Sequence, residues 1–233
     1  FLKNILKFER KLHSVISYHF TQTYGEQQSF HLDQNNFNYI AQHQNGIDEL
    51  TRRLGKLATS PSDYAYINYH KHKYNNVPLW VLINAVTLGS VSKFYMYSKP
   101  GLQSKICIDF PNLNEKQLEQ ILSVITKFRN VCAHGERLFT YKTKDSIGDL
   151  LIHQKLGIPI KNNLYQYGKN DLFAVVISLR YILSKEDFFS FKHQLSSLID
   201  TLVKSTCLTE SEILSAMGFP SNWKKITSYR KLS

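Results

Sequence analysis

The chain has 233 residues, enough to bury a sizeable core as one domain or as a domain with a helical appendage. Hydrophobic residues make up 42% and charged residues 20%, a balance that excludes a disordered chain. Lys and Arg number 29 against 18 Asp and Glu, so the net charge is +11. Such a charge favours a polyanionic partner, of which nucleic acid is the commonest, although an evenly solvated basic surface gives the same count.

No stretch of the sequence is apolar for the ~20 residues that a membrane span needs. The longest candidate, residues 79–97, is interrupted by polar side chains, so we expect no membrane partner. The chain begins with Phe1 rather than Met, and we expect further residues before it in the natural protein. The cysteines are three in number and form no Cys-x-x-Cys pair, which indicates neither a disulfide framework nor a zinc site and favours a reducing, cytoplasmic setting. They are Cys107, Cys132 and Cys207.

The first half of the chain is patterned for helices. Apolar residues recur at three- and four-residue steps and predict one amphipathic helix over the first two dozen residues. Residues 21–36 are polar and predict a loop or a short irregular helix. Residues 40–57 are weakly periodic, and a break at residues 60–63 precedes another helix start. Residues 76–94 predict the most apolar helix, which should lie centrally.

The second half continues in the same way. Residues 98–112 predict a connector, and Asn114 is a suitable N-cap for a motif helix over about residues 114–138. Residues 140–169 predict a loop, and residues 172–183 and 188–202 predict two further helices. A turn at residues 218–223 should lead into a basic tail. That tail contains Lys224, Lys225, Arg230 and Lys231. Because no alternating strand pattern is present, the predicted fold class is all-α.

One constellation carries chemistry: Arg129 and His134, which are separated by four residues. The spacing alone is weak evidence, because an Arg on a helix surface and a hydrogen-bonded His would produce it as well. The wider sequence is more specific. Residues 129–139 read Arg-Asn-Val-Cys-Ala-His-Gly-Glu-Arg-Leu-Phe, residues 78–83 read Pro-Leu-Trp-Val-Leu-Ile, and residues 217–223 read Met-Gly-Phe-Pro-Ser-Asn-Trp.

These three blocks resemble the HEPN superfamily of helical ribonucleases, and more closely its abortive-infection proteins of the AbiD/AbiF type. One departure is Gly135, where a second His or another larger polar residue is expected and where Gly should loosen the helix end. The resemblance implies one HEPN-like domain over residues 1–233, a helical bundle with additional helices, whose C-terminal helical part covers about residues 170–233. It further implies catalysis by Arg129, Asn130 and His134 in a homodimer.

The activity implied by the resemblance is metal-independent cleavage of RNA through the 2′-hydroxyl, in a phage-defence or toxin system restrained by an antitoxin, either a protein or a small RNA. No cofactor is implied. The residue types agree with this chemistry, since His transfers protons near neutral pH and Arg holds phosphate through two parallel hydrogen bonds. On a helix, Asn130 and His134 lie one turn apart, whereas Arg129 is rotated by about 140° from His134. A two-fold dimer that brings two such helices together would supply two residues of each kind around one cleft.

Further basic residues are candidates for RNA binding. The alternative, that these side chains form a basic surface that only faces water, fits the sequence equally well. They are Arg137, which lies near the motif if its helix continues, and Arg52, Arg53, Lys56, Lys71 and Lys73. No metal site is predicted, because Asp145, Asp149 and His153 lie in a loop-like region. We interpret Trp80 and Trp223 as packing residues, and Cys132 as a small buried residue rather than a nucleophile. Two alternatives to the ribonuclease stay open: a helical module that binds RNA or a partner without cleaving, and a scaffold dimer.

Overall fold

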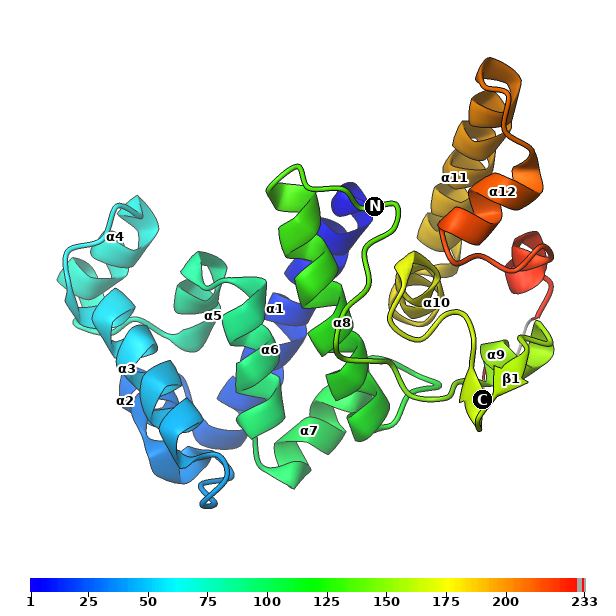
Figure 1. Cartoon of the computed structure of the whole chain (residues 1–233). Helices are drawn as coiled ribbons and strands as arrows, with labels where there is room; N and C mark the ends of the chain where they lie inside the picture. Colours follow the sequence, from blue (N-terminus) through cyan, green and yellow to red (C-terminus); the bar gives the residue numbers. More distant parts are fainter. Residues whose placement is uncertain (230–231, 233) are drawn as a thin grey trace. The chain divides into compact units, whose positions relative to one another are not determined.

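The computed structural model describes residues 1–229 and 232, which divide into two compact units. Unit 1 contains residues 1–8 and 110–233, and unit 2 contains residues 9–109. In both units the regular structure is helical apart from a single pair of two-residue strands within the described residues (Figure 1), so the predicted all-α class is confirmed. The prediction of one domain over the whole chain stays a prediction. Among the described residues, no helix is both long and apolar enough to cross a membrane.

Unit 2 is a cluster of short helices around an aromatic centre. Phe94 contacts Phe20 and Phe37 edge-on, with ring centroids 5.5 and 5.1 Å away. The central helix α3 packs against α2, α4 and α6. The elements are α1 (Leu2–Tyr24, which begins in unit 1), α2 (Gln28–Leu32), η1 (Gln34–Asn36), α3 (Gln44–Thr59), α4 (Ala65–Tyr74), α5 (Leu79–Leu82), η2 (Ile83–Ala85), α6 (Leu88–Tyr97) and α7 (Pro100–Cys107).

Two predictions for this unit were wrong. The apolar helix expected over residues 76–94 is divided into α5, η2 and α6, because Thr87 is an N-cap whose hydroxyl accepts a hydrogen bond from the backbone N–H of Ser90 at 3.3 Å. The connector expected over residues 98–112 contains α7. Pro100 starts that helix, where its fixed φ is favourable and its missing N–H costs nothing.

Unit 1 is organised around α10, whose residues are buried on nearly every side and which packs against α8. The elements are α8 (Glu115–Ala133), α9 (Leu151–Lys155), β1 (Ile160–Lys161), β2 (Leu164–Tyr165), α10 (Leu172–Ile182), α11 (Lys185–Ser205), α12 (Glu210–Ala216) and η3 (Trp223–Thr227). Asn114 is the N-cap of α8 in a capping box with Gln117, as the sequence predicted. β1 and β2 form an antiparallel hairpin that turns at Asn162 and Asn163, both with positive φ.

The loop predicted for residues 140–169 is wrong in part, because it contains α9 and the hairpin. Fully buried His153 anchors this segment: its ring stacks on Tyr165 at 4.9 Å, and its Nε2 atom lies 2.8 Å from the carbonyl oxygen of Gly168. The closing turn places Trp223 in the core against Phe219, so the packing role predicted for Trp223 is confirmed. Of the predicted basic tail, Arg230 and Lys231 lie outside the described residues.

Candidate functional site

The three predicted catalytic residues lie at the C-terminal end of α8. Buried Phe128 and Val131 belong to the apolar face of this helix, and α8 packs against α10, so its last turn is held firmly. Arg129 is half-buried, with its Nε atom enclosed by protein. Asn130 and His134 are exposed. The side chains that could touch a substrate therefore stand on a helix whose position is set by core packing.

A glycine ends the helix directly after the histidine. His134 is the C-cap of α8, and its backbone N–H donates to the carbonyl oxygen of Asn130 at 3.0 Å. Gly135 follows with φ +67°. The N–H of Glu136 returns to the carbonyl oxygen of Val131 at 3.1 Å, and that of Gly135 lies 3.4 Å from the carbonyl oxygen of Cys132. This pair of bonds is the Schellman motif, in which a left-handed residue satisfies the last carbonyl groups of a helix.

The turn changes two predictions. Gly135 does not loosen the helix end as expected, because it ends the helix with hydrogen bonds and a defined backbone direction. The motif helix, expected to reach residue 138, ends at Ala133. Arg137 is therefore exposed on the segment beyond the helix, and the helical argument that placed it beside His134 does not apply.

The segment after the turn folds back along α8. Tyr141 packs edge-on against Phe128, with ring centroids 5.1 Å apart. The carboxylate of Asp145 accepts hydrogen bonds from Lys127 and Ser123, and these contacts, that of Lys127 first, hold the pKa of Asp145 below its usual range. Tyr141 and Asp145, both beyond the motif, are thus tied to α8, which limits the freedom of the loop that contains Arg137.

Cys132 lies inside the motif and is half-buried. Burial raises the pKa of its thiol above the usual value, so the thiol stays protonated near neutral pH. A nucleophilic role would need the opposite shift, which agrees with the interpretation of Cys132 as a small packing residue.

Five of the six residues predicted to bind RNA lie in unit 2, on two helices that pack together. Three are exposed on α3, and Lys71 and Lys73 lie on α4. The Lys71 ammonium donates to the carbonyl oxygen of Thr59, the last residue of α3, and so links the two helices. The three residues on α3 are Arg52, Arg53 and Lys56.

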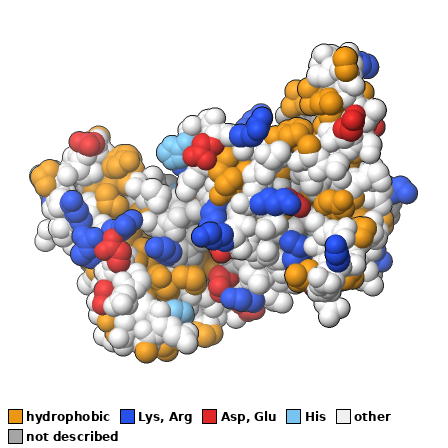
Figure 2. Space-filling model, viewed as in Figure 1, with side chains coloured by type: hydrophobic (Ala, Val, Ile, Leu, Met, Phe, Trp, Pro, Cys, Tyr) orange, Lys and Arg blue, Asp and Glu red, His pale blue; other side chains and the backbone are white. Residues whose placement is uncertain are grey.

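Part of this positive charge is already paired. The carboxylate of Glu49 accepts hydrogen bonds from Arg53 and from Arg52, and the Nη2 atom of Arg52 lies 2.6 Å from its Oε2 atom. These two contacts lower the pKa of Glu49. The ammonium of Lys73 donates to the hydroxyl of Tyr69 at 2.7 Å and lies 5.2 Å from the centre of the Tyr74 ring. Lys and Arg side chains are scattered over the face drawn in Figure 2, several of them beside Asp or Glu.

Within the described residues, no group of three or more His, Cys, Asp or Glu side chains could hold a metal ion. The three residues considered for such a role have other partners. Asp145 binds Lys127, Asp149 pairs with Lys169 at 2.5 Å, and His153 is buried against backbone carbonyl groups.

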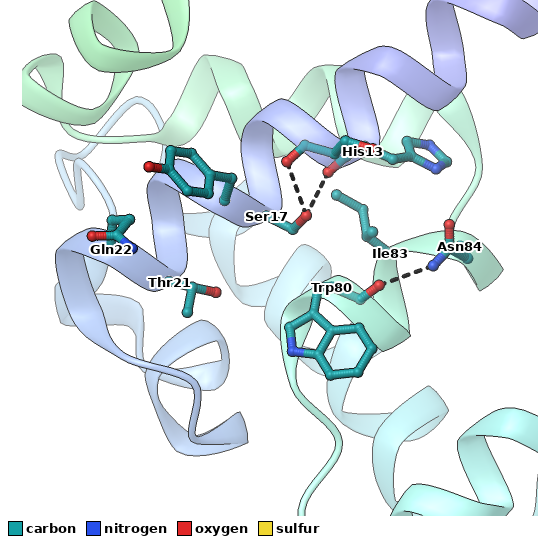
Figure 3. A pocket seen from close by; sticks show the side chains of 9 residues that line it. His13, Ser17, Thr21, Gln22, Trp80, Ile83 and Asn84 are labelled. Atoms are coloured by element: carbon teal, nitrogen blue, oxygen red, sulfur yellow. Dashed lines mark hydrogen bonds between the residues drawn. The ribbon is translucent and has the colours of Figure 1, made fainter.

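The interpretation of Trp80 as a packing residue was wrong, because 49% of its side chain is exposed. It lines a cavity of about 400 Å³ in unit 2 together with residues of α1 and η2 (Figure 3). The sequence offered one signal for this cavity. His13 and Ser17 interrupt the apolar face of α1 at helical spacing, and both are buried polar residues.

The fold and the motif define an all-α protein with an Arg and a His on the last turn of a core helix. Residues 1–140, more than half of the chain, match the family model of Abi-like proteins. The chain therefore belongs to the family of Abi-like proteins, and this membership indicates a role in abortive infection, a defence against phage. The match includes α1 to α8 and ends before α9. Comparisons with curated proteins and with solved structures gave no match.

Proposed function

We propose that the chain is a metal-independent endoribonuclease of the HEPN type, which acts as a homodimer in abortive infection. The observation that carries this proposal is the end of α8. A capped helix presents an exposed His134 and, five positions earlier, a half-buried Arg129, in a chain of the Abi-like family. A pure binding module has no need of a side chain that can both donate and accept a proton, as the imidazole of His can.

The chemistry requires a base, an acid and a cation beside the phosphate. The base removes the proton of the 2′-hydroxyl, whose oxygen attacks the adjacent phosphorus. The bond from phosphorus to the 5′-oxygen breaks, and the acid supplies a proton to that leaving oxygen. The products are a 2′,3′-cyclic phosphate and a 5′-hydroxyl. In this proposal His134 transfers protons, Arg129 stabilises the phosphate charge, and Asn130 orients His134 or the ribose.

The geometry of one helix supports the proposed dimer. Arg129 and His134 differ by about 140° in direction and by about 7.5 Å along the axis of α8. A two-fold axis near two such helices would supply two residues of each kind around one phosphate. An active ribonuclease would also harm its host, so we propose that an antitoxin, a protein or a small RNA, restrains it.

The first test is cleavage of total RNA in the presence of EDTA. We expect the wild-type protein to cleave, and His134→Ala and Arg129→Ala each to lose about 10²–10⁴ in rate while melting temperatures stay nearly unchanged. Matched controls are His193→Ala and Arg10→Ala, which remove an exposed His and an exposed Arg elsewhere. Wild-type cleavage by His134→Ala would overturn the assignment. Loss of activity in EDTA with recovery on adding Mg²⁺ would overturn its metal independence.

The second test addresses the dimer. An excess of protomers that carry both Arg129→Ala and His134→Ala, mixed with wild type, should reduce cleavage if subunits exchange. A fully active monomer, identified by light scattering at the assay concentration, would refute the composite site and leave both residues to act from one chain.

One observation favours a second function, RNA binding without cleavage. The five basic residues on α3 and α4 form a charged surface on unit 2 that does not include α8. A protein that binds RNA in a salt-dependent manner and leaves it intact under all conditions tested would support this alternative.

A further inference from the structure

The cavity beside Trp80 is built from α1 on one side and from α5 and η2 on the other (Figure 3). Helix α1 contributes a polar stripe at four-residue spacing: His13, Ser17 and Thr21. Trp80 and Asn84 line the opposite wall. With a volume of about 400 Å³, the cavity falls within the ~300–1,000 Å³ typical of small-molecule sites.

One polar side chain of this cavity lacks a partner. The hydroxyl of Thr21 has no hydrogen-bond partner among the described residues, whereas the buried ring of His13 bonds to the side chain of Asn84. The Ser17 hydroxyl donates to the carbonyl oxygen of His13 at 2.7 Å, which leaves its lone pairs able to accept. A buried polar group without a partner is costly, so the Thr21 hydroxyl, together with the free lone pairs of Ser17, favours a bound molecule that carries hydrogen-bonding groups.

The cavity carries no charge. None of its lining residues is Lys, Arg, Asp or Glu. Burial lowers the pKa of His13, although contact with the Asn84 side chain acts in the opposite direction, so its ring is neutral near neutral pH. A phosphate or a carboxylate would find no counter-charge here, and the part of a ligand that enters must be neutral.

Trp80 supplies a flat apolar surface. Its ring is half-exposed, and His70 from α4 packs against it at 88°, with centroids 5.1 Å apart, which holds the indole in place. On its other side Trp80 lines a second cavity of about 460 Å³ together with His70 and Tyr74. The ammonium of Lys73 lies beside this Tyr74 ring. Aromatic rings next to a cation are the usual features of sites that stack nucleic-acid bases.

We propose that the Trp80 cavity binds a nucleobase, whose face stacks on the indole and whose polar edge bonds to Ser17 and Thr21. A neutral heteroaromatic ring meets each requirement of the wall: it is flat, uncharged and lined with donors and acceptors. The base belongs either to single-stranded RNA or to a free nucleotide. The RNA source rests on the proposed function, whereas the cavity itself does not.

The test measures binding with a full chain that carries His134→Ala, so that no cleavage interferes. Trp80 is half-exposed whereas Trp223 is fully buried, so quenching of the tryptophan emission reports on Trp80. The probes are oligouridylate, oligoadenylate, the free nucleotides UMP and AMP, and an abasic oligonucleotide of equal length. We expect quenching by probes that carry bases and none by the abasic chain. Saturation by UMP or AMP alone would identify a free nucleotide as the source, and quenching by oligonucleotides alone would identify RNA.

Variants are compared by the anisotropy of a labelled oligonucleotide or nucleotide. Trp80→Ala should weaken binding by roughly 5- to 100-fold, the effect of losing one stacked base. Thr21→Val should weaken binding without lowering the melting temperature, because it removes a hydroxyl that has no partner in the protein. The controls are Phe189→Ala, an aromatic residue that is 42% exposed, and Thr126→Val, which removes another buried hydroxyl without a partner.

Equal binding of the abasic probe, or unchanged affinity in both Trp80→Ala and Thr21→Val, would overturn the proposal. The ribonuclease activity and the base-binding cavity can fail separately. A protein that binds bases through Trp80 but never cleaves RNA would refute the ribonuclease alone. A protein that cleaves RNA without Trp80-dependent binding would refute the cavity alone.

Discussion

Replacement of Gly135 by alanine tests how the end of α8 holds His134. The residue has φ +67°, and a Cβ atom built there meets no other atom within 4 Å. The cost of Gly135→Ala is therefore conformational and not steric. A left-handed backbone costs an L-residue about 1–2 kcal/mol, and the stiffer unfolded chain returns about 0.4–1 kcal/mol, which leaves a loss of about 1 kcal/mol.

A matched control exists in the same unit. Gly157 ends α9 with φ +60° and the same open surroundings. Its N–H donates to the carbonyl oxygen of Gln154 at 2.9 Å, and the N–H of Ile158 donates to that of His153 at 3.1 Å, so the motif is the same. Gly157→Ala should cost a similar free energy of unfolding without touching the proposed catalytic residues.

Urea denaturation and RNA cleavage together distinguish stability from positioning. Both variants should lose about 1 kcal/mol, or about 2–4 °C in melting temperature. Only Gly135→Ala should also lose cleavage, by as much as ~100-fold if His134 moves by about 1 Å. Gly135→Asn should be milder in both assays, because Asn tolerates the left-handed region. Unchanged stability of Gly135→Ala would refute the turn, and an equal loss of cleavage in both variants would refute the link to His134.

Three further predictions concern stability and binding. Burial lowers the pKa of His31 from 6.5 to about 4. As the pH falls, His31 therefore takes up a proton in the unfolded state before it does so in the folded state. The protein should lose about 3 kcal/mol of its free energy of unfolding, beginning near pH 6.5 and ending as the pH falls through about 4. Denaturation curves near neutral pH and at about pH 4 should show a smaller loss for His31→Gln, and an equal loss in both proteins would exclude His31 as the source. Asp171 caps α10 with a buried carboxylate, and burial raises the pKa of this group. In chemical denaturation, Asp171→Asn should therefore change the free energy of unfolding by less than about 1 kcal/mol, whereas Asp171→Ala should lower it by about 2 kcal/mol. Equal losses in the two variants would contradict a capping role for Asp171. If Lys73 contacts a phosphate of single-stranded RNA, Lys73→Ala should reduce the slope of log affinity against log salt by about 0.7, and the exposed control Lys185→Ala should leave it unchanged.

Local signals in the sequence were sufficient for the long helices. Helix α1 follows from apolar residues at three- and four-residue steps, and the start of α8 follows from Asn114, whose side chain accepts the N–H of Gln117 at 2.8 Å. The motif at residues 129–134 was found in the same way, by residue type and spacing. Such features depend on neighbours within a few positions, so a sequence read in short windows contains them.

Tertiary structure decided the features that depend on distant segments. The sequence has Gly135 after His134, but only the bonds of the turn show that it ends the helix there instead of loosening it. Whether a tryptophan is core or surface depends on what packs over it, and this separates buried Trp223 from half-exposed Trp80. Ser17 and Thr21 come to face Trp80 only because α1 folds against α5 and η2, which lie about 60 positions further along the chain. Periodicity specifies which face of a helix is apolar. Whether another element covers that face or leaves it open is determined by the packing of the whole unit.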